Sequence, residues 1–183
     1  MPRHRHDPSK NLVGFLVGEV MYAVRIEMVR EIVNPLDVVR LPRAPKSVLG
    51  VADYRGVVVP VIDLRQRFAL PPVEQSRKTK WIVLDVAAPM SSATAGPVSL
   101  VAGRYAALVV DAVTEVFGYG KDGVRPAPPL GQGDDVRGIE GVTTFGFGER
   151  EKLVFVLDAR AFSALAEAAL GAELPAGVVS ETL

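Results

Sequence analysis

The sequence is most informative between Gly50 and Arg65, where it reads GVADYRGVVVPVIDLR. Gly50 and Gly56 bracket Arg55, and residues 57–62 that follow carry no polar side chain. An apolar, valine-rich run that ends in turn residues is typical of a strand buried on both faces. We therefore expect Arg55 to stand on a rigid turn at the mouth of a core strand. This position favours docking, with a solvated turn charge as the alternative.

Length and composition limit the function classes. A chain of 183 residues suits one domain, or two small subdomains that share a core. The absence of cysteine excludes disulfides, thiolate metal sites and thiol catalysis. Lys+Arg and Asp+Glu are both 21, so no net charge favours nucleic acid as a partner. With neither a secretory signal nor an apolar span, we expect a soluble, cytoplasmic protein without membrane insertion.

Short strands dominate the predicted secondary structure. Alternating or continuous apolar runs predict them at residues 12–17, 20–24, 38–41, 48–62 (two strands around the turn at 54–56), 81–86, 98–102, 105–110, 113–119, 139–144 and 153–157. From Ile26 to Val33 the apolar period changes to three or four, which predicts a short amphipathic helix ending at Asn34-Pro35. Asp63 is placed to cap a short helix, and Asp158 to cap a longer one over 159–170.

Many short strands and a single longer helix favour an all-β protein built as barrels or a sandwich. The polar connector at residues 71–80 divides the chain, which suggests two small barrels packed on each other. Residues 1–11 and 171–183 are expected to be tails. Each barrel alone would be marginal, because small domains bury too little of their surface.

Few residues suggest catalysis. His4 and His6 lie in the polar amino-terminal tail, where a weak metal site is far less common than plain solvation. Four aspartates end apolar runs and could serve as paired carboxylates of a small hydrolase, although aspartates at strand ends more often cap turns and helices: Asp63, Asp85, Asp111 and Asp158. The glycines between 118 and 148 form no phosphate-binding pattern. We predict no enzyme activity, no cofactor and no metal.

Several motifs resemble those of CheW-like domains. The string YAVRIEMVREI at 22–32 resembles the family's opening, where a strand leads to Val-x-Glu-Ile. The remaining motifs follow in the family's order: Pro42 and Pro45, Gly50-Val51, Arg55-Gly56, Pro60–Arg65, Val109–Val116, Val124–Pro128 and Leu153–Asp158. The likeness covers roughly residues 12–170. Each motif is weak by itself, but their number and order make the resemblance specific.

The resemblance implies a fold and a function. CheW-like domains consist of two SH3-like five-stranded barrels, which we expect at about 18–70 and at 80–157 plus the first strand, with the helix at 159–170 closing the domain. The implied function is that of a non-enzymatic adaptor. Such proteins bridge the cytoplasmic tip of a methyl-accepting chemoreceptor and the regulatory domain of a CheA-type histidine kinase, in the cytoplasm and at membrane-associated receptor arrays.

Candidate binding residues follow from the same resemblance. Val29, Glu31 and Ile32 match the region associated with receptor contact. Arg55-Gly56 matches the family's Asn-x-Arg-Gly turn, which is important for complex formation.

The chain departs from that turn at Asp53 and Tyr54, where Asn-Leu is usual. The carboxylate of Asp53 is expected to be able to pair with Arg55 and partly hold it back. These departures leave a second interpretation open, in which the chain is a specialised paralogue that binds only one of the two partners or serves a pathway other than motility.

Overall fold

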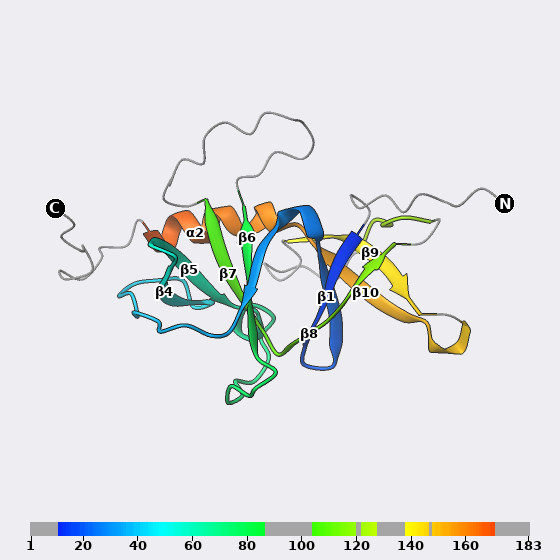
Figure 1. Ribbon diagram of the computed structural model, residues 1–183, viewed down its shortest axis with the longest axis horizontal. Helices are drawn as coiled ribbons and strands as arrows, with labels where there is room; N and C mark the ends of the chain where they lie inside the picture. Colours follow the sequence, from blue (N-terminus) through cyan, green and yellow to red (C-terminus); the bar gives the residue numbers. More distant parts are fainter. Residues whose placement is uncertain (1–10, 87–103, 120–121, 128–137, 147, 171–183) are drawn as a thin grey trace.

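Two five-stranded sheets make up the structure, a computed structural model that describes residues 11–86, 104–119, 122–127, 138–146 and 148–170. The first sheet, here called unit A, has the strand order β8-β1-β2-β10-β9. Its strands are β1 (Asn11–Val17), β2 (Val20–Arg25), β8 (Ala112–Gly118), β9 (Ile139–Phe145) and β10 (Lys152–Leu157). Unit A occupies the right half of the molecule in Figure 1.

The second sheet, unit B, has the order β3-β6-β7-β5-β4 and fills the left half of Figure 1. Its strands are β3 (Val29–Val33), β4 (Val48–Tyr54), β5 (Val57–Asp63), β6 (Lys80–Asp85) and β7 (Tyr105–Val110). Short helical segments connect or follow the strands: η2 (Ile26–Met28), α1 (Leu64–Arg67), η4 (Gly148–Arg150), η5 (Ala159–Phe162) and α2 (Ser163–Leu170). The all-β class and the two five-stranded units are therefore confirmed.

The strands are shared between the units differently from the expected division at residues 71–80. β6 and β7, which follow that connector, pair with β3 and β5 in unit B, whereas β2 belongs to unit A. The hydrophobic pattern identifies strands but does not say which strands pair. Here the parallel pairs β5–β7 and β2–β10 join segments that are far apart in the chain. Of the tail predicted at 1–11, residues 1–10 lie outside the described residues and Asn11 is the first residue of β1. The predicted tail at 171–183 and the expected strand at 98–102 also lie outside the described residues.

The opening stretch forms β4, a two-residue turn and β5, as predicted. Val61 packs against Trp81 in a cluster on one face of unit B, and Ile62 lies in the core shared by both units. β5 is thus buried on both faces, which explains its run of apolar residues. The Asp63 side chain then caps α1 by accepting a hydrogen bond from the backbone N–H of Arg65 at 2.8 Å.

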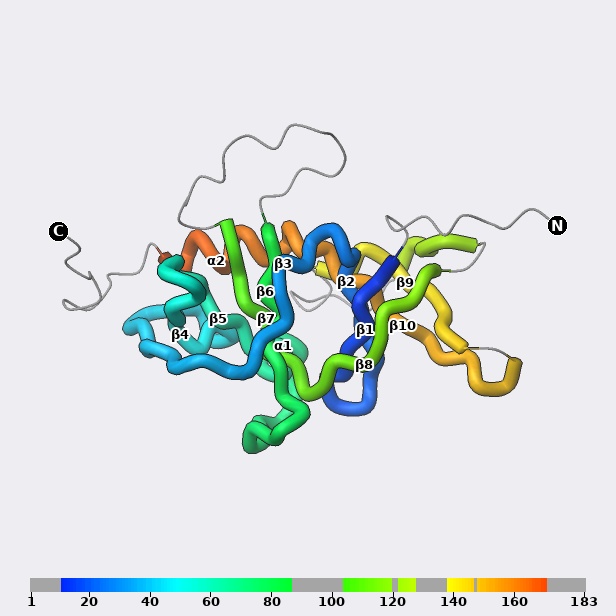
Figure 2. Tube along the Cα trace, viewed as in Figure 1, coloured from blue at the N-terminus to red at the C-terminus, as the bar shows by residue number. Residues whose placement is uncertain are grey.

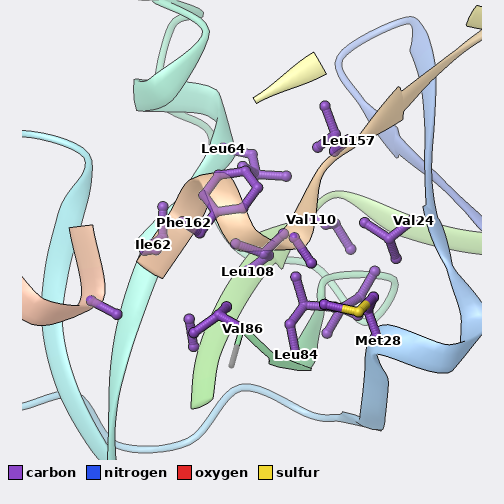
Figure 3. Close-up of a cluster of buried hydrophobic side chains, with 14 of the residues drawn as sticks. Val24, Met28, Ile62, Leu64, Leu84, Val86, Leu108, Val110, Leu157 and Phe162 are labelled. Carbon is purple, nitrogen blue, oxygen red and sulfur yellow. The ribbon is translucent and has the colours of Figure 1, made fainter. Parts of the chain in front are cut away.

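A common core joins the two units (Figure 3). It contains Val24 and Leu157 from unit A and Leu84 and Leu108 from unit B. Helix α2 follows β10 of unit A, yet it lies against β4, β5 and β7 of unit B. Phe162, in η5 just before α2, is 2% exposed in this core. The chain therefore passes from one unit to the other after β2, after β7 and after β10, and neither unit is independent.

The predicted helix from Ile26 to Val33 is wrong beyond its first turn. Only Ile26–Met28 is helical, and Val29–Val33 forms strand β3, which pairs with β6. A bulge between Val29 and Glu31 shifts the face that the side chains occupy, so the apolar spacing imitates a helical period. Likewise, the strand expected at 38–41 is a single bridge between Val39 and Val51.

The two units repeat one topology in register. β3, β4, β5, β6 and β7 of unit B pair with one another as β8, β9, β10, β1 and β2 do in unit A. Among the residues that the structure describes, each unit has one bridge outside the named strands, Val39–Val51 in B and Arg125–Val142 in A. A glycine stands beside each bridge, Gly50 or Gly141. Side-chain atoms are excluded there, because a Cβ on Gly141 would lie 2.2 Å from the carbonyl oxygen of Arg125.

Candidate functional site

The turn between β4 and β5 fixes the position of Arg55. Arg55 and Gly56 have φ angles of 52° and 79°, so both central residues of this two-residue turn are left-handed, as a type I′ hairpin requires. The Asp53 carboxylate accepts a hydrogen bond of 2.7 Å from the Gly56 backbone N–H and braces the turn. Arg55 thus occupies a backbone conformation that few non-glycine residues adopt.

Glu31 of β3 connects the two outer strands of unit B. Its carboxylate accepts a hydrogen bond of 2.5 Å from the Tyr54 hydroxyl and one of 2.8 Å from Nη2 of Arg55. β3 and β4 are the first and last strands of this sheet, so the contacts bring its two edges together. We call Glu31, Tyr54 and Arg55 the Glu31 cluster.

Asp53 does not restrain Arg55 in the way the sequence suggested. Its carboxylate binds the Gly56 N–H, and the partner of Arg55 is Glu31. The expected pairing is wrong because Asp53 and Tyr54 point to opposite faces of β4, and the Arg55 guanidinium lies on the Tyr54 side, 5.8 Å from the centre of that ring. Asp53 instead acts on the backbone, as aspartates in turns commonly do.

Exposure separates the residues that can meet a partner from those that hold the site together. The Arg55 side chain is 71% exposed and that of Glu31 is 33% exposed. Ile32, the next residue on β3, is 39% exposed, whereas Tyr54 is 6% exposed. Val29 is half-buried and packs against the shared core. The structure therefore exposes the Arg55 guanidinium, which lies over the buried Tyr54 ring, and the Ile32 side chain, which alternation along β3 directs to the opposite face from Glu31.

The cluster also changes the acidity of Glu31. The Tyr54 hydroxyl and, next in importance, the Arg55 guanidinium donate to the ionised carboxylate and hold the pKa of Glu31 below its usual range. Because the pKa is lower in the folded state, this carboxylate stabilises the fold above the ordinary glutamate pKa. Its contribution is lost as the pH falls through the folded-state value.

Substituting Tyr54 with phenylalanine is expected to raise the pKa of Glu31 toward that of an ordinary glutamate, because the largest cause of its depression is removed. A titration of the Glu31 side-chain carboxyl by NMR in the full chain measures the change. The same substitution at Tyr22, which is buried in β2 of unit A, serves as the control and should leave the pKa of Glu31 unaffected. An unchanged Glu31 titration in the Tyr54 variant would mean that the hydroxyl does not bind the carboxylate.

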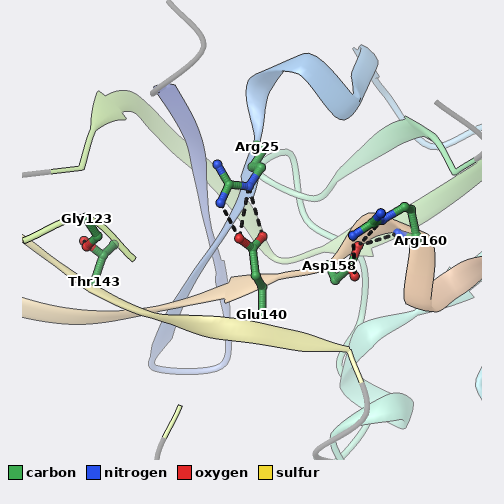
Figure 4. Close-up of polar contacts among 6 residues, drawn as sticks. All are labelled: Arg25, Gly123, Glu140, Thr143, Asp158 and Arg160. Atoms are coloured by element: carbon green, nitrogen blue, oxygen red, sulfur yellow. Dashed lines mark hydrogen bonds and ion pairs between the residues drawn. The ribbon is translucent and has the colours of Figure 1, made fainter. Parts of the chain in front are cut away.

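The four strand-end aspartates all have donors. Asp63 and Asp158 cap helical segments, and Asp158 also contacts the guanidinium of Arg160 (Figure 4). Asp85 accepts from Arg104 at 2.7 Å. Asp111 accepts from the Gly18 N–H at 2.7 Å and from Nε of Arg65 at 2.9 Å.

Two of these aspartates share a surface cavity. Asp63 and Asp111 line a space of about 180 Å³ together with Arg65. Asp85 and Asp158 do not line it. The carboxylate of Asp63 is occupied by backbone N–H groups, and that of Asp111 is bound to Arg65. The arrangement suits a structural role that ties α1 to the start of unit A's β8.

Other polar contacts fasten the strand ends of unit A. Figure 4 shows Arg25, the last residue of β2, reaching the carboxylate of Glu140 on β9. The hydrogen bonds to Glu140 raise the pKa of Arg25 further above its usual value. Thr143 donates to the Gly123 carbonyl at 3.2 Å, next to the bridge at Arg125. Within the described ranges, no group of three acidic or histidine side chains is placed to hold a metal ion.

Glu31 and Arg55 were predicted as binding residues from the sequence. The ion pair between them and the bond from the Tyr54 hydroxyl to Glu31 were not predicted. The missing information was the closure of the sheet, which places residues 23 and 24 positions apart side by side. The sequence also contains a repeated motif that relates unit B to unit A. The pattern Val-x-Glu-Ile at 29–32 recurs as Val-x-Glu-Val at 113–116, and it marks equivalent strands.

The fold and the cluster define a class of protein: a module of two packed SH3-like barrels with a rigid, charged hairpin tip. The family model for the CheW-like domain matches residues 11–167. The chain belongs to the CheW-like family. Among the helices of the described ranges, none has the length and apolarity needed to cross a bilayer.

Similar proteins agree with this assignment. The chain is 40% identical to the chemotaxis protein CheW of Helicobacter pylori over 72 residues, which are 39% of this chain and 44% of that protein. It is 28% identical to CheW of Rhizobium meliloti over 70% of this chain and 73% of the relative. The crystal structure of the scaffolding protein TtCheW from Thermoanaerobacter tengcongensis is similar with a TM-score of 0.65 and 26% identity, covering 86% of this chain and 89% of that one.

Proposed function

We propose that this protein is a non-enzymatic adaptor of a bacterial chemosensory array, which couples methyl-accepting chemoreceptors to a CheA-type histidine kinase. The observation that carries the proposal is the Glu31 cluster. It holds an exposed guanidinium on a strained but braced turn, and Arg55 is the arginine that the family places at its Arg-Gly turn. Rigidly positioned arginines are common anchors of protein interfaces.

The residues available to a partner have the character of a binding surface. Ile32 offers apolar area and Arg55 offers donors, since only its Nη2 is used within the cluster. Val29, in the same strand as Ile32, packs against the shared core and so holds β3 in place. We assign this surface to the cytoplasmic tip of a receptor. The kinase regulatory domain then binds elsewhere on the two barrels, and the protein is recruited from the cytoplasm to membrane-associated arrays.

One observation favours the narrower alternative, a paralogue that binds one partner or serves a pathway other than motility. Tyr54 replaces the leucine that is usual in the family, and its hydroxyl occupies one oxygen of Glu31. A carboxylate engaged in this way has less capacity for a partner's donors. The receptor contact is therefore the one that this alternative would weaken.

The hydrolase alternative receives little support. Its candidate carboxylates are engaged by backbone N–H groups or guanidinium groups, and only Asp63 and Asp111 lie around one cavity. A general base needs a lone pair free for the substrate's proton. The adaptor proposal requires no such group.

Calorimetric titrations with each partner alone test the proposal. We expect the purified full chain to bind both a soluble fragment of the receptor tip and an isolated kinase regulatory domain with micromolar dissociation constants, a range in which array multivalency adds avidity. Binding of the kinase domain alone would favour the paralogue alternative. Binding of neither would contradict the adaptor function.

A further inference from the structure

Unit A contains a groove that lies apart from the Glu31 cluster. It has a volume of about 520 Å³, and every residue that lines it belongs to unit A. Its apolar wall includes Val20 and Leu153, which are 39% and 49% exposed. The β1–β2 turn and the β9–β10 turn border it, and Figure 2 shows both turns on the lower side of unit A.

The internal repeat identifies this groove as the counterpart of the Glu31 cluster. Ile32 pairs with Ile82 in unit B as Val116 pairs with Val13 in unit A, so Glu31 corresponds to Glu115. The correspondence extends to β4 of unit B and β9 of unit A. Val48 pairs with Ile62 as Ile139 pairs with Leu157, and counting along each strand makes Phe145 the equivalent of Tyr54. Both Glu115 and Phe145 line the groove.

The two counterparts differ in the hydrogen-bond donors that reach the glutamate carboxylate. In unit B the Tyr54 hydroxyl and Arg55 bind Glu31, and the short turn brings Arg55 back onto β3. In unit A, Phe145 has no hydroxyl and the turn between β9 and β10 is longer, spanning 146–151. Among the described residues, no hydrogen bond or ion pair reaches the Glu115 carboxylate.

The chemistry of unit B indicates what unit A lacks. A glutamate at this position takes an aromatic hydroxyl and a guanidinium as donors, beside apolar side chains. The unit A groove has the glutamate and the apolar wall, but its lining holds no aromatic hydroxyl, and no guanidinium reaches the Glu115 carboxylate among the described residues. Arg150 and Lys152 line the groove as well, so that it presents positive charge beside the negative charges of Glu19 and Glu115.

We propose that this groove is a second binding site, which takes a segment of a partner protein carrying an aromatic side chain next to an arginine. The aromatic ring lies against Val20, Leu153 and Phe145, and the guanidinium binds Glu115. Acidic residues that flank such a segment would face Arg150 and Lys152, which makes the charges complementary on both sides. This site is independent of the receptor contact and of the adaptor function proposed above.

Methyl-detected NMR of the full chain tests this site with the dipeptide N-acetyl-Tyr-Arg-amide as probe. We expect saturable shifts of the Val20, Met21 and Leu153 methyl groups. Glu115→Gln should weaken binding about tenfold, because a charged hydrogen-bonding partner is removed. Glu27→Gln, which removes the same charge at an exposed position outside the groove, should leave the affinity unchanged.

A second probe keeps the aromatic residue and reverses the charge. N-acetyl-Tyr-Glu-amide should bind about tenfold more weakly, or worse, if Glu115 binds the guanidinium. Equal binding of the two dipeptides, or equal binding by the wild type and Glu115→Gln, would overturn the proposal. So would an absence of shifts at the groove methyl groups. Shifts at these methyl groups that depend on protein concentration without any peptide would also overturn it, since a second copy of the chain would then be the occupant.

Discussion

Gly141→Ala is expected to lower the free energy of unfolding by about 3 kcal/mol, the upper part of the usual range for overpacking. A Cβ at this position would lie 2.2 Å from the Arg125 carbonyl oxygen and 2.7 Å from a methyl carbon of Val124. This carbonyl accepts a hydrogen bond of 2.8 Å from the Val142 N–H, and a second bond of 2.8 Å runs from the Arg125 N–H to the Val142 carbonyl. The backbone must therefore move, and the bridge that joins this segment to β9 is lost.

Gly50→Ala should have an effect at least as large, because its Cβ would lie 2.1 Å from the Val39 carbonyl oxygen and its φ of 150° is also unfavourable for alanine. Gly123→Ala is the matched control. It has a positive φ but no atom within 4 Å of the added Cβ, so we expect a loss of only about 1 kcal/mol. Urea unfolding measures all three. Equal losses at Gly141 and Gly123 would contradict the close approach at the bridge.

Arg55→Glu is expected to weaken receptor-tip binding about thirtyfold, as the loss of an interface hot spot of about 2 kcal/mol does. The substitution removes the exposed guanidinium and sets a second carboxylate against Glu31. Like charges at this distance repel, and the hairpin tip then loses the ion pair with Glu31, while the Tyr54 hydroxyl bond to β3 remains. Titration calorimetry with the receptor tip gives the affinity, and circular dichroism confirms that the variant is folded.

Arg40→Glu separates a local effect from a general one. Arg40 is exposed and has no ion-pair partner among the described residues, and its reversal changes the net charge by the same amount. We expect its affinity for the receptor tip to stay within about twofold of the wild type, as for a charge outside the interface. A similar loss for both variants would show that overall charge, and not the Glu31 cluster, determines binding.

Local sequence signals predicted much of the fold. The hairpin at residues 48–62 and the caps at Asp63 and Asp158 depend on neighbours within a few positions, and all three are present. The helix predicted at Ile26–Val33 was wrong from Val29 on, because the five residues of β3 are too few to separate a bulged strand from a helix by apolar spacing. The membership of β6 and β7 in unit B depends on pairing between distant segments, which a hydrophobic pattern does not encode.

The candidate site was predicted in its members but not in its contacts. Arg55 was singled out by its glycine-bracketed turn and, like Glu31, by the resemblance to a family, whereas the Tyr54 hydroxyl bond and the role of Asp53 in the turn depend on three-dimensional placement. Glu115 and Phe145 were not singled out as site residues, although the repeated Val-x-Glu motif points to Glu115. Recognising them required the strand registers, which show that the two motifs occupy equivalent positions.

If one copy of this protein joins a receptor to a kinase, the three proteins must form a single complex. Sedimentation velocity of the full chain mixed with a soluble receptor-tip fragment and a kinase regulatory domain tests this most directly. We predict a single boundary that contains all three components and that disappears when the adaptor is omitted. Separate binary complexes that never combine, or a receptor–kinase boundary that is unchanged without the adaptor, would contradict the coupling function.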